Sequence, residues 1–235
     1  VSDSLEVKVD FLPQWKVAVK TPISAVNTSA DLKEEEFTRA VALGLFDYLR
    51  KSYSGGFVIS LSGGADSAAT AVLVKLMADL GIQELGEEMF RDRLGHICFD
   101  DRPMMEQLLA CVYQSTRNSS KTTRDAAKEV AKAIGANYQE WDVDELVEGY
   151  RLMVEKGIGR DLNWDDDDIP LQNIQARVRA PGVWMLTNIR NALLLSTSNR
   201  SEAAVGYATM DGDTSGGLSP ISGIDKAFLR HWLRW

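Results

Sequence analysis

A short apolar run that ends in a glycine pair constrains the fold of this chain more than any other feature. Residues 57–61 read FVISL, and the polar sequence SGGADS follows directly at 62–67. A continuous apolar run with β-branched residues is typical of a strand that is buried on both faces of a parallel sheet. Because a helical pattern follows from about Ser67 to Leu80, the segment predicts a strand, a glycine turn and a helix.

The rest of the chain continues this alternation of strands and helices. Further buried strands are expected at 109–115, 137–143 and 192–198. Helices are expected at 31–50, from 122 or 123 to 134, at 144–156, at 172–190 with strain near Pro181, and from Asp225 onward. The order predicts an α/β fold built on a doubly wound parallel sheet with right-handed crossovers. The ligand of such a sheet lies at the carboxyl ends of the strands, where we expect the polar loops after Leu61, Ser115 and Ser198 to meet.

The composition narrows the class of protein. With 235 residues and 45% hydrophobic content, the chain can bury the core of one sizeable α/β domain. The net charge of −8 argues against nucleic acid as a partner, because binding to a phosphate backbone needs a basic surface. No apolar run approaches the ~18 residues of a membrane span. We therefore expect no membrane partner. Cys98 and Cys111 are too few for a disulfide framework or a zinc quartet. Reduced thiols are expected instead, as in a cytoplasmic protein.

The glycine loop lacks both common signatures of nucleotide binding. It has no lysine of the G-x-x-x-x-G-K-[ST] type and no G-x-G-x-x-G spacing. Gly63 and Gly64 still allow backbone N–H groups to approach an anion, at the start of a helix whose dipole favours negative charge. Asp66 would repel a bare phosphate, so we expect a cation such as Mg²⁺ between them. The alternative is an ordinary turn in which Asp66 or Ser67 is the N-cap of the helix.

Two stretches of the chain resemble a known family. The sequence SLSGGADS resembles the S-G-G-x-D-S loop of the N-type ATP pyrophosphatases, which split ATP between the α- and β-phosphates and hold pyrophosphate in this loop. The loop alone also fits GMP synthetases, asparagine synthetases and tRNA-thiolating enzymes. The stretch that begins LQNIQARVRAPGVW and continues to residue 235 is similar to the NAD synthetases, and most to the synthetase domain of their glutamine-dependent branch. The resemblance covers roughly residues 30–235 and is specific from 172 onward.

The resemblance also implies a domain organisation. Residues 31–235 are expected to form the NAD synthetase domain, which would lack its C-terminal end because the family continues past HWLRW. Residues 1–30 are expected to be an N-terminal extension or linker with short strands, since residues 1–20 alternate apolar and polar side chains. Residues 1–20 fit a segment that joins a glutaminase domain outside this chain. The family further implies a homodimer.

The resemblance implies a role for each residue that matches the family's motifs. ATP would be bound by Lys226, by Thr197 and by the loop Ser60, Leu61, Ser62, Gly63, Gly64, Ala65, Asp66 and Ser67. Deamido-NAD would be bound by Asn173, Arg177, Glu202, Tyr207, Ala208, Thr209 and Met210. Asp66 and Glu202 would hold Mg²⁺ and, together with Lys226, form the catalytic set. Met210 departs from the family pattern, since ammonia-dependent members carry a lysine at the matching place.

Several of these residues also fit plainer roles. Glu202 fits the first turn of a helix, where the dipole favours a carboxylate. Arg177 and Arg179 fit a solvated charged face as well as a pair that faces the phosphates of a dinucleotide. The stretch DGDTSGGLSP, residues 211–220, fits a flexible surface loop.

The function implied by the resemblance is the ATP-dependent amidation of deamido-NAD to NAD. The substrates would be ATP with Mg²⁺, deamido-NAD, and ammonia that is either free or released by a glutaminase domain. An adenylated intermediate would form with release of pyrophosphate, and ammonia would then displace AMP. Two alternatives stay open, another ATP pyrophosphatase of the GMP synthetase type and a nucleotide-binding fragment without catalysis.

Overall fold

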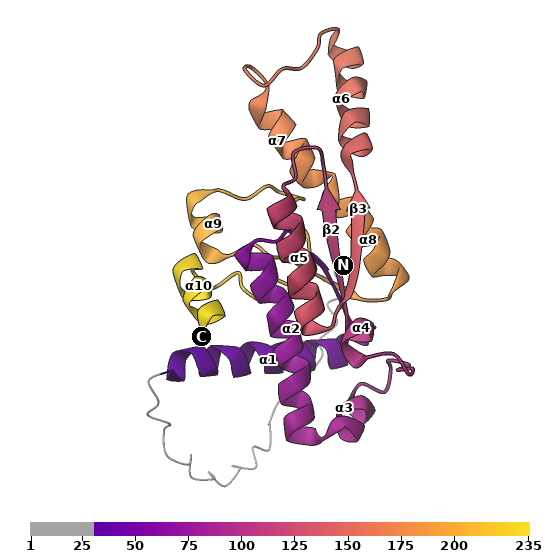
Figure 1. Cartoon of the computed structure of the whole chain (residues 1–235), viewed down its shortest axis with the longest axis vertical. Helices are drawn as coiled ribbons and strands as arrows, with labels where there is room; N and C mark the ends of the chain where they lie inside the picture. Colours follow the sequence, from indigo (N-terminus) through magenta and orange to yellow (C-terminus); the bar gives the residue numbers. More distant parts are fainter. Residues whose placement is uncertain (1–30) are drawn as a thin grey trace, which may run out of the picture. The chain divides into compact units, whose positions relative to one another are not determined.

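A parallel sheet of four strands organises the described part of the chain, residues 31–235 of this computed structural model (Figure 1). The strands are β1 (Phe57–Ser60), β2 (Leu109–Ser115), β3 (Asn137–Asp142) and β4 (Leu193–Leu195). Their order is β3-β2-β1-β4, and every pairing is parallel. The expected parallel α/β fold is therefore confirmed. The strands and the linker expected within residues 1–30 lie outside the described residues.

Ten helices surround this sheet within residues 31–235. They are α1 (Leu32–Ser52), α2 (Ala65–Leu85), α3 (Glu87–Arg93), α4 (Met104–Leu108), α5 (Lys121–Ile134), α6 (Asp144–Ile158), α7 (Asp168–Arg177), α8 (Arg179–Ile189), α9 (Arg200–Val205) and α10 (Lys226–Arg234). Helices α3 and α4 are too short to show a clear period in the sequence and were not expected. Across the described residues, no helix combines the length and the apolar character that crossing a membrane requires.

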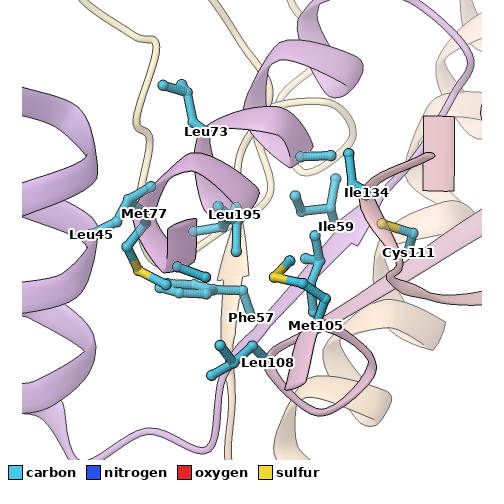
Figure 2. Close-up of a cluster of buried hydrophobic side chains, with 14 of the residues drawn as sticks. Leu45, Phe57, Ile59, Leu73, Met77, Met105, Leu108, Cys111, Ile134 and Leu195 are labelled. Carbon is cyan, nitrogen blue, oxygen red and sulfur yellow. The ribbon is translucent and has the colours of Figure 1, made fainter. Parts of the chain in front are cut away.

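The two faces of the sheet pack against different helices. Alternate strand residues point to opposite faces, so Phe57 and Ile59 join the larger apolar cluster with α1, α2 and α5 (Figure 2). Val58 and Leu194 point the other way and pack against Val183 of α8. Each fully buried side chain of this size contributes about 1.5–3 kcal/mol through removal of apolar surface from water. The burial of both faces explains why β1 and β2 read as continuous apolar runs rather than alternating ones.

Pro181 divides the helix expected at 172–190 into two, so the expected single helix is wrong, whereas the expected disturbance near Pro181 is confirmed. Helix α7 begins four residues earlier, at Asp168, and ends at Arg177, and α8 follows after Val178. Proline has no N–H, so residue 181 leaves the carbonyl of Arg177 without the helical bond that would continue α7. The proline instead occupies the first turn of α8, where no N–H donor is needed. The break at Val178 therefore falls three residues before the proline that causes it.

Helix α2 is longer at both ends than its sequence pattern predicts. It begins at Ala65 instead of near Ser67, and it continues past Leu80 and Gly81 to Leu85. A Cβ atom at Gly81 would lie 2.5 Å from the Phe90 ring of α3. The glycine therefore serves close packing between α2 and α3 rather than ending the helix.

The strand order creates a switch point between β1 and β4. The chain moves from β1 outward to β2 and β3 and then returns through α6, α7 and α8 (Figure 1). It thereby places β4 on the other side of β1. Ligands of open α/β sheets bind where the connections diverge in this way, beyond the carboxyl ends of the strands. The loops after β1 and β4 are therefore the first place to look for a site.

Candidate functional site

The loop after β1 leaves the first backbone N–H groups of α2 without a side-chain cap from within residues 31–235. Gly63 has φ of +80°, and a Cβ atom there would lie 2.2 Å from the carbonyl oxygen of Thr123 in α5. Gly64 is the N-cap of α2, and none of the described side chains caps this end of the helix. The first N–H groups of α2 therefore stay available to an anion, with the positive end of the helix dipole behind them.

The serines of the loop bond to each other and to the loop backbone. The hydroxyl groups of Ser62 and Ser67 lie 3.0 Å apart, and Ser67 Oγ donates to the carbonyl of Gly64 at 3.2 Å. Ser62 Oγ in turn accepts from the Gly64 N–H at 3.2 Å. Because α2 starts at Ala65, the alternative in which Asp66 or Ser67 is the N-cap is wrong.

Asp66, Glu202 and Lys226 meet at the carboxyl end of the sheet. Lys226 Nζ donates to Asp66 Oδ2 at 3.0 Å and to Glu202 Oε1 at 2.9 Å. Asn199 Nδ2 donates to the other oxygen of Asp66 at 2.9 Å. The hydrogen bond with Glu202, and then the pair with Asp66, outweigh burial and raise the pKa of Lys226. The lysine is therefore a firmly held cation between two carboxylates.

Glu202 also closes the start of α9. Its backbone N–H donates to Asn199 Oδ1 at 3.0 Å, and its Oε2 accepts from the Asn199 N–H at 3.4 Å, which is a capping box. The plainer reading of Glu202 as a residue of the first helical turn is thus correct, and the side chain also reaches Lys226. The Glu202 carboxylate therefore fixes the loop after β4 and, through Lys226, also faces Asp66 after β1.

Asp66 and Glu202 can supply two of the ligands that a magnesium ion needs, and the remaining ligands must come from elsewhere. Within residues 31–235 no three His, Cys, Asp or Glu side chains gather closely enough to hold a metal ion. Mg²⁺ in nucleotide sites is commonly held by one or two carboxylates together with phosphate oxygens and water. Asp66 and Glu202 fit that arrangement, because both face one position from the two sides of the switch point.

A cavity of about 340 Å³ lies beside this cluster, at the carboxyl ends of β1, β2 and β4. Three of its lining residues, Ser60, Ser62 and Thr197, were expected to bind ATP. The walls not expected from the sequence come from β2, from the loop before α5 and from α5, and from α7, α8 and the loop after α9. They include Tyr113, Gln114, Ser119, Thr123, Asp213 and Ser215. Arg179, which also lines the cavity, was already a candidate for facing the phosphates of a dinucleotide. Leu61 was expected in the ATP site, but its side chain is fully buried in the core, and only its backbone belongs to the loop.

Arg179 supplies the cavity wall with a cation that no carboxylate neutralises. Its Nε donates to the carbonyl of Gln114 at 3.2 Å, and its Nη1 donates to the carbonyl of Gln175. Of the carboxylates in the described residues, none lies within ion-pair distance of its guanidinium group. Burial lowers the pKa of Arg179, as expected for a cation removed from water. Since Arg179 lines the cavity, the solvated-face alternative does not describe it.

Gln114 adds an unpaired polar group beside Arg179. Its Nε2 donates to Ser60 Oγ at 3.2 Å, whereas its Oε1 has no partner among the described residues. The side chain is only 5% exposed. Gln114 and Arg179 thus make this cavity wall polar at the end of β2.

The residues expected to bind deamido-NAD lie on α7, α9 and the loop that follows α9. Arg177 Nε donates to the carbonyl of Met210 at 3.0 Å, so these two expected residues do meet. Tyr207, Ala208 and Met210 are exposed, and the Thr209 N–H donates to Asp213 Oδ1 at 2.7 Å. Asn173 is partly exposed on α7.

Sequence reasoning missed Asn199, which joins the loops after β1 and β4. Asn199 is almost fully buried and contacts both Asp66 and Glu202. The spacing N-x-x-E at 199–202 was a usable signal, because it is the pattern of a capping box. Tyr113 and Gln114 could have been flagged by their place at the carboxyl end of β2.

Comparison with protein families and curated proteins finds one consistent match. The family described as NAD synthase matches residues 37–235. The glutamine-dependent NAD(+) synthetase of Oryza sativa subsp. indica is 32% identical over 238 residues, which cover 91% of this chain and 32% of that protein. The chain therefore spans about a third of the length of this curated relative.

Two solved structures share the fold. The glutamine-dependent NAD(+) synthetase from Cytophaga hutchinsonii is 53% identical with a TM-score of 0.81, covering 86% of this chain and 37% of that one. The NH3-dependent NAD synthetase from Campylobacter jejuni is 21% identical with a TM-score of 0.65, covering 86% of this chain and 72% of that one. At that identity the second match supports the fold alone.

Proposed function

Because this chain belongs to the NAD synthase family, we propose that it forms NAD from deamido-NAD, ATP and ammonia, with release of AMP and pyrophosphate. The observation that carries the proposal is the open glycine loop at the switch point, with Asp66, Glu202 and Lys226 gathered beside it. The family match favours this reaction over the GMP synthetase-type alternative.

The reaction requires positioning and charge neutralisation more than a protein nucleophile. The carboxylate of the nicotinic acid ring attacks the α-phosphorus of ATP, and the bond to the β-phosphate oxygen breaks as pyrophosphate leaves. Ammonia then attacks the acyl carbon, AMP departs, and the nitrogen loses a proton to give the amide. Backbone N–H groups at the start of α2 are suited to bind the pyrophosphate as its charge grows.

Asp66 and Glu202 are the residues proposed to hold Mg²⁺, with Ser62 and Ser67 beside the phosphates. When bound there, Mg²⁺ would neutralise phosphate charge and orient the oxygens. Lys226 is a second cation within reach of the same phosphates.

The cavity beside the loop is proposed to receive the rest of the ATP molecule. Arg179, which forms no ion pair among the described residues, favours a ligand with an anionic, hydrogen-bonding part, while Asp213 and several apolar side chains line the rest of the cavity. Thr197 and Ser60 line the same cavity, which supports their proposed contacts with ATP. Deamido-NAD is proposed to bind along α7 and the loop after α9, with contacts from Asn173, Arg177, Tyr207, Ala208, Thr209 and Met210.

The source of ammonia belongs to the proposal as well. We propose that it comes from a glutaminase domain, because the glutamine-dependent relative is about three times longer than the region matched here. Ammonium salts should then replace glutamine in an assay of this chain. A cytoplasmic location is part of the same proposal and is supported by the free thiol of Cys111 within β2.

A homodimer is proposed from the apolar surface of α6, α7 and α8. These helices expose large apolar side chains, namely Leu146, Leu152, Met153, Ile158, Ile169, Met185 and Ile189. A contiguous exposed apolar patch is typical of a surface that another protein covers, and the proposal is that these side chains form such a patch. Light scattering that gives the mass of a monomer at micromolar concentration would contradict this part of the proposal.

The test is NAD formation from deamido-NAD, Mg-ATP and ammonium chloride, with pyrophosphate measured in parallel. We expect both products from the unmodified chain, in equal amounts. Formation of pyrophosphate without NAD would show that the loop supports ATP cleavage and would contradict deamido-NAD as the acceptor acid. If neither product forms while ATP still binds, the nucleotide-binding alternative is favoured.

Asp66→Asn tests the site residue by residue. The change should lower turnover by about a hundredfold or more, because it removes a charge from the position proposed for Mg²⁺. Asp79→Asn is a matched control on the same helix, since Asp79 is also paired with a lysine, Lys75, but lies away from the loop. Near-normal turnover in a folded Asp66→Asn protein would contradict the proposed role of Asp66 in binding Mg²⁺.

A further inference from the structure

Lys226 occupies the position between the two carboxylates that are proposed to hold Mg²⁺. Its Nζ is 3.0 Å from Asp66 Oδ2 and 2.9 Å from Glu202 Oε1. Both carboxylate side chains are only 16% exposed, whereas the lysine side chain is 40% exposed. The cation therefore covers the solvent side of the carboxylate pair.

Every oxygen of the two carboxylates already has a donor. Asn199 donates to Asp66 Oδ1 from its side chain and to Glu202 Oε2 from its backbone, and Lys226 bonds to the remaining oxygen of each carboxylate. Each carboxylate oxygen can accept more than one bond, but a metal ion placed between the two carboxylates would take the position of the Lys226 ammonium group. Asn199 is held by the capping box and is almost fully buried, so Lys226 is the donor that can leave.

The backbone of Lys226 is anchored separately from its ammonium group, which bonds to Asp66 and Glu202. Its N–H donates to Ser201 Oγ at 3.0 Å, at the first position of α10. A flexible stem of four carbons links this anchor to the ammonium group. The ammonium group can therefore change partners without movement of α10, provided that another anion is close enough to receive it.

Nucleotide phosphates would supply what such an exchange needs. They bring negative charge for the released ammonium group and oxygen ligands that complete the coordination of Mg²⁺, which rarely binds through two carboxylates alone. We propose that Lys226 fills the metal position of the nucleotide-free protein and moves to the phosphates when nucleotide binds, so that metal and nucleotide enter together. The inference rests on the proposed metal role of Asp66 and Glu202.

The occupancy of the metal position can be measured with Mn²⁺, whose electron paramagnetic resonance signal reports the free ion. The unmodified chain should bind Mn²⁺ tightly only with α,β-methylene ATP present. Lys226→Met should bind Mn²⁺ without nucleotide at least about tenfold more tightly than the unmodified chain, because a positive charge has left the carboxylates. Lys226→Arg keeps the charge and should keep the exclusion.

The outcomes separate this inference from the proposed function. If Lys226→Met binds Mn²⁺ no better than the unmodified chain, while Asp66→Asn abolishes Mn²⁺ binding to the nucleotide complex, the metal role stands and the exclusion by Lys226 is refuted. If Asp66→Asn leaves Mn²⁺ binding to the nucleotide complex intact, the metal role and the inference both fall. Thermal unfolding checks that each variant is folded, and Lys226→Gln replaces Lys226→Met if the latter is not.

Discussion

Alanine substitutions at the two adjacent glycines of the loop should have different effects. Gly63→Ala should mainly reduce stability, whereas Gly64→Ala should mainly weaken ATP binding. In Gly63→Ala the new methyl group would lie 2.2 Å from the Thr123 carbonyl oxygen and 2.9 Å from its carbonyl carbon, so it would need to move by about 0.8 Å to reach even 3.0 Å. Both contacts are to backbone, so no rotamer change relieves them. A left-handed φ adds about 1–2 kcal/mol for alanine, and overpacking a rigid site adds about 1–3 kcal/mol.

We therefore expect Gly63→Ala to lower the free energy of unfolding by about 2–5 kcal/mol, a large share of a typical domain stability of about 5–15 kcal/mol. Gly64 has φ of −87°, and a methyl group there meets only the flexible side chain of Ser62, at 3.3 Å. Gly64→Ala should cost no more than about 1 kcal/mol as an N-cap change, yet weaken ATP binding because the methyl group stands at the mouth of the loop. Urea unfolding and ATP titration measure the two effects, and a Gly63→Ala protein within about 1 kcal/mol of the unmodified chain would refute the steric argument.

Two further predictions concern buried charges. Arg179→Gln should weaken ATP binding about ten- to a hundredfold, the loss of one charge-assisted hydrogen bond, while Arg190→Gln should not change it in a calorimetric titration. Arg190 is a matched control because burial also lowers its pKa and it also donates to a backbone carbonyl, that of Gln107, but at the opposite end of the sheet. Hydrogen bonds from Arg160 and from the backbone of Asn163 lower the pKa of Asp167 to about 2, so its stabilising effect is complete above the ordinary carboxyl range and disappears as the pH falls toward 2. The stability difference between the unmodified chain and Asp167→Asn should shrink between about pH 5 and pH 2, and a difference that stays constant in urea unfolding over this range would contradict the assignment.

The strands were predictable because strands buried on both faces appear in the sequence as continuous apolar runs. Strand β2 matches its predicted bounds, 109–115, because all seven of its residues are buried and polar segments follow. The strand expected at 192–198 ends at Leu195, since Ser196 leaves the ladder and bonds instead to the returning chain at Leu218. A serine can continue a strand or leave it, and only the tertiary partner decides which.

The helix starts were less predictable, for a different reason. The break at Val178 is caused by a residue three positions later, and Gly81 lies inside a helix because Phe90 packs against it. The proline indicated strain in the local pattern, but not the residue at which the helix breaks. The packing of Gly81 depends on a neighbouring helix, which a local pattern cannot report. Family resemblance, which the comparisons confirm, added knowledge that periodicity could not supply.

The site was only partly accessible from the sequence. Asp66, Glu202 and Lys226 were named through the resemblance, and the structure brings them together, but their chemical roles remain predictions. Arg179 was named only as one of two arginines that could face a dinucleotide. Gln114 was not named, because a polar residue at a strand end gives no sign of which wall it will join. Burial and missing partners are properties of the assembled fold.

The cluster at the switch point also has a consequence for how the chain matures during synthesis. Asp66 meets Asn199 across 133 residues and Lys226 across 160. A nascent chain that leaves the ribosome in order can pair β1 with β2 early, but it must wait for most of its length before β4 takes the free side of β1. The glycine loop therefore exists for many seconds without its lysine and asparagine, at ordinary elongation rates of about 5–20 residues per second. The cluster that is proposed to bind Mg²⁺ and phosphate is therefore complete only after Lys226 has been synthesised.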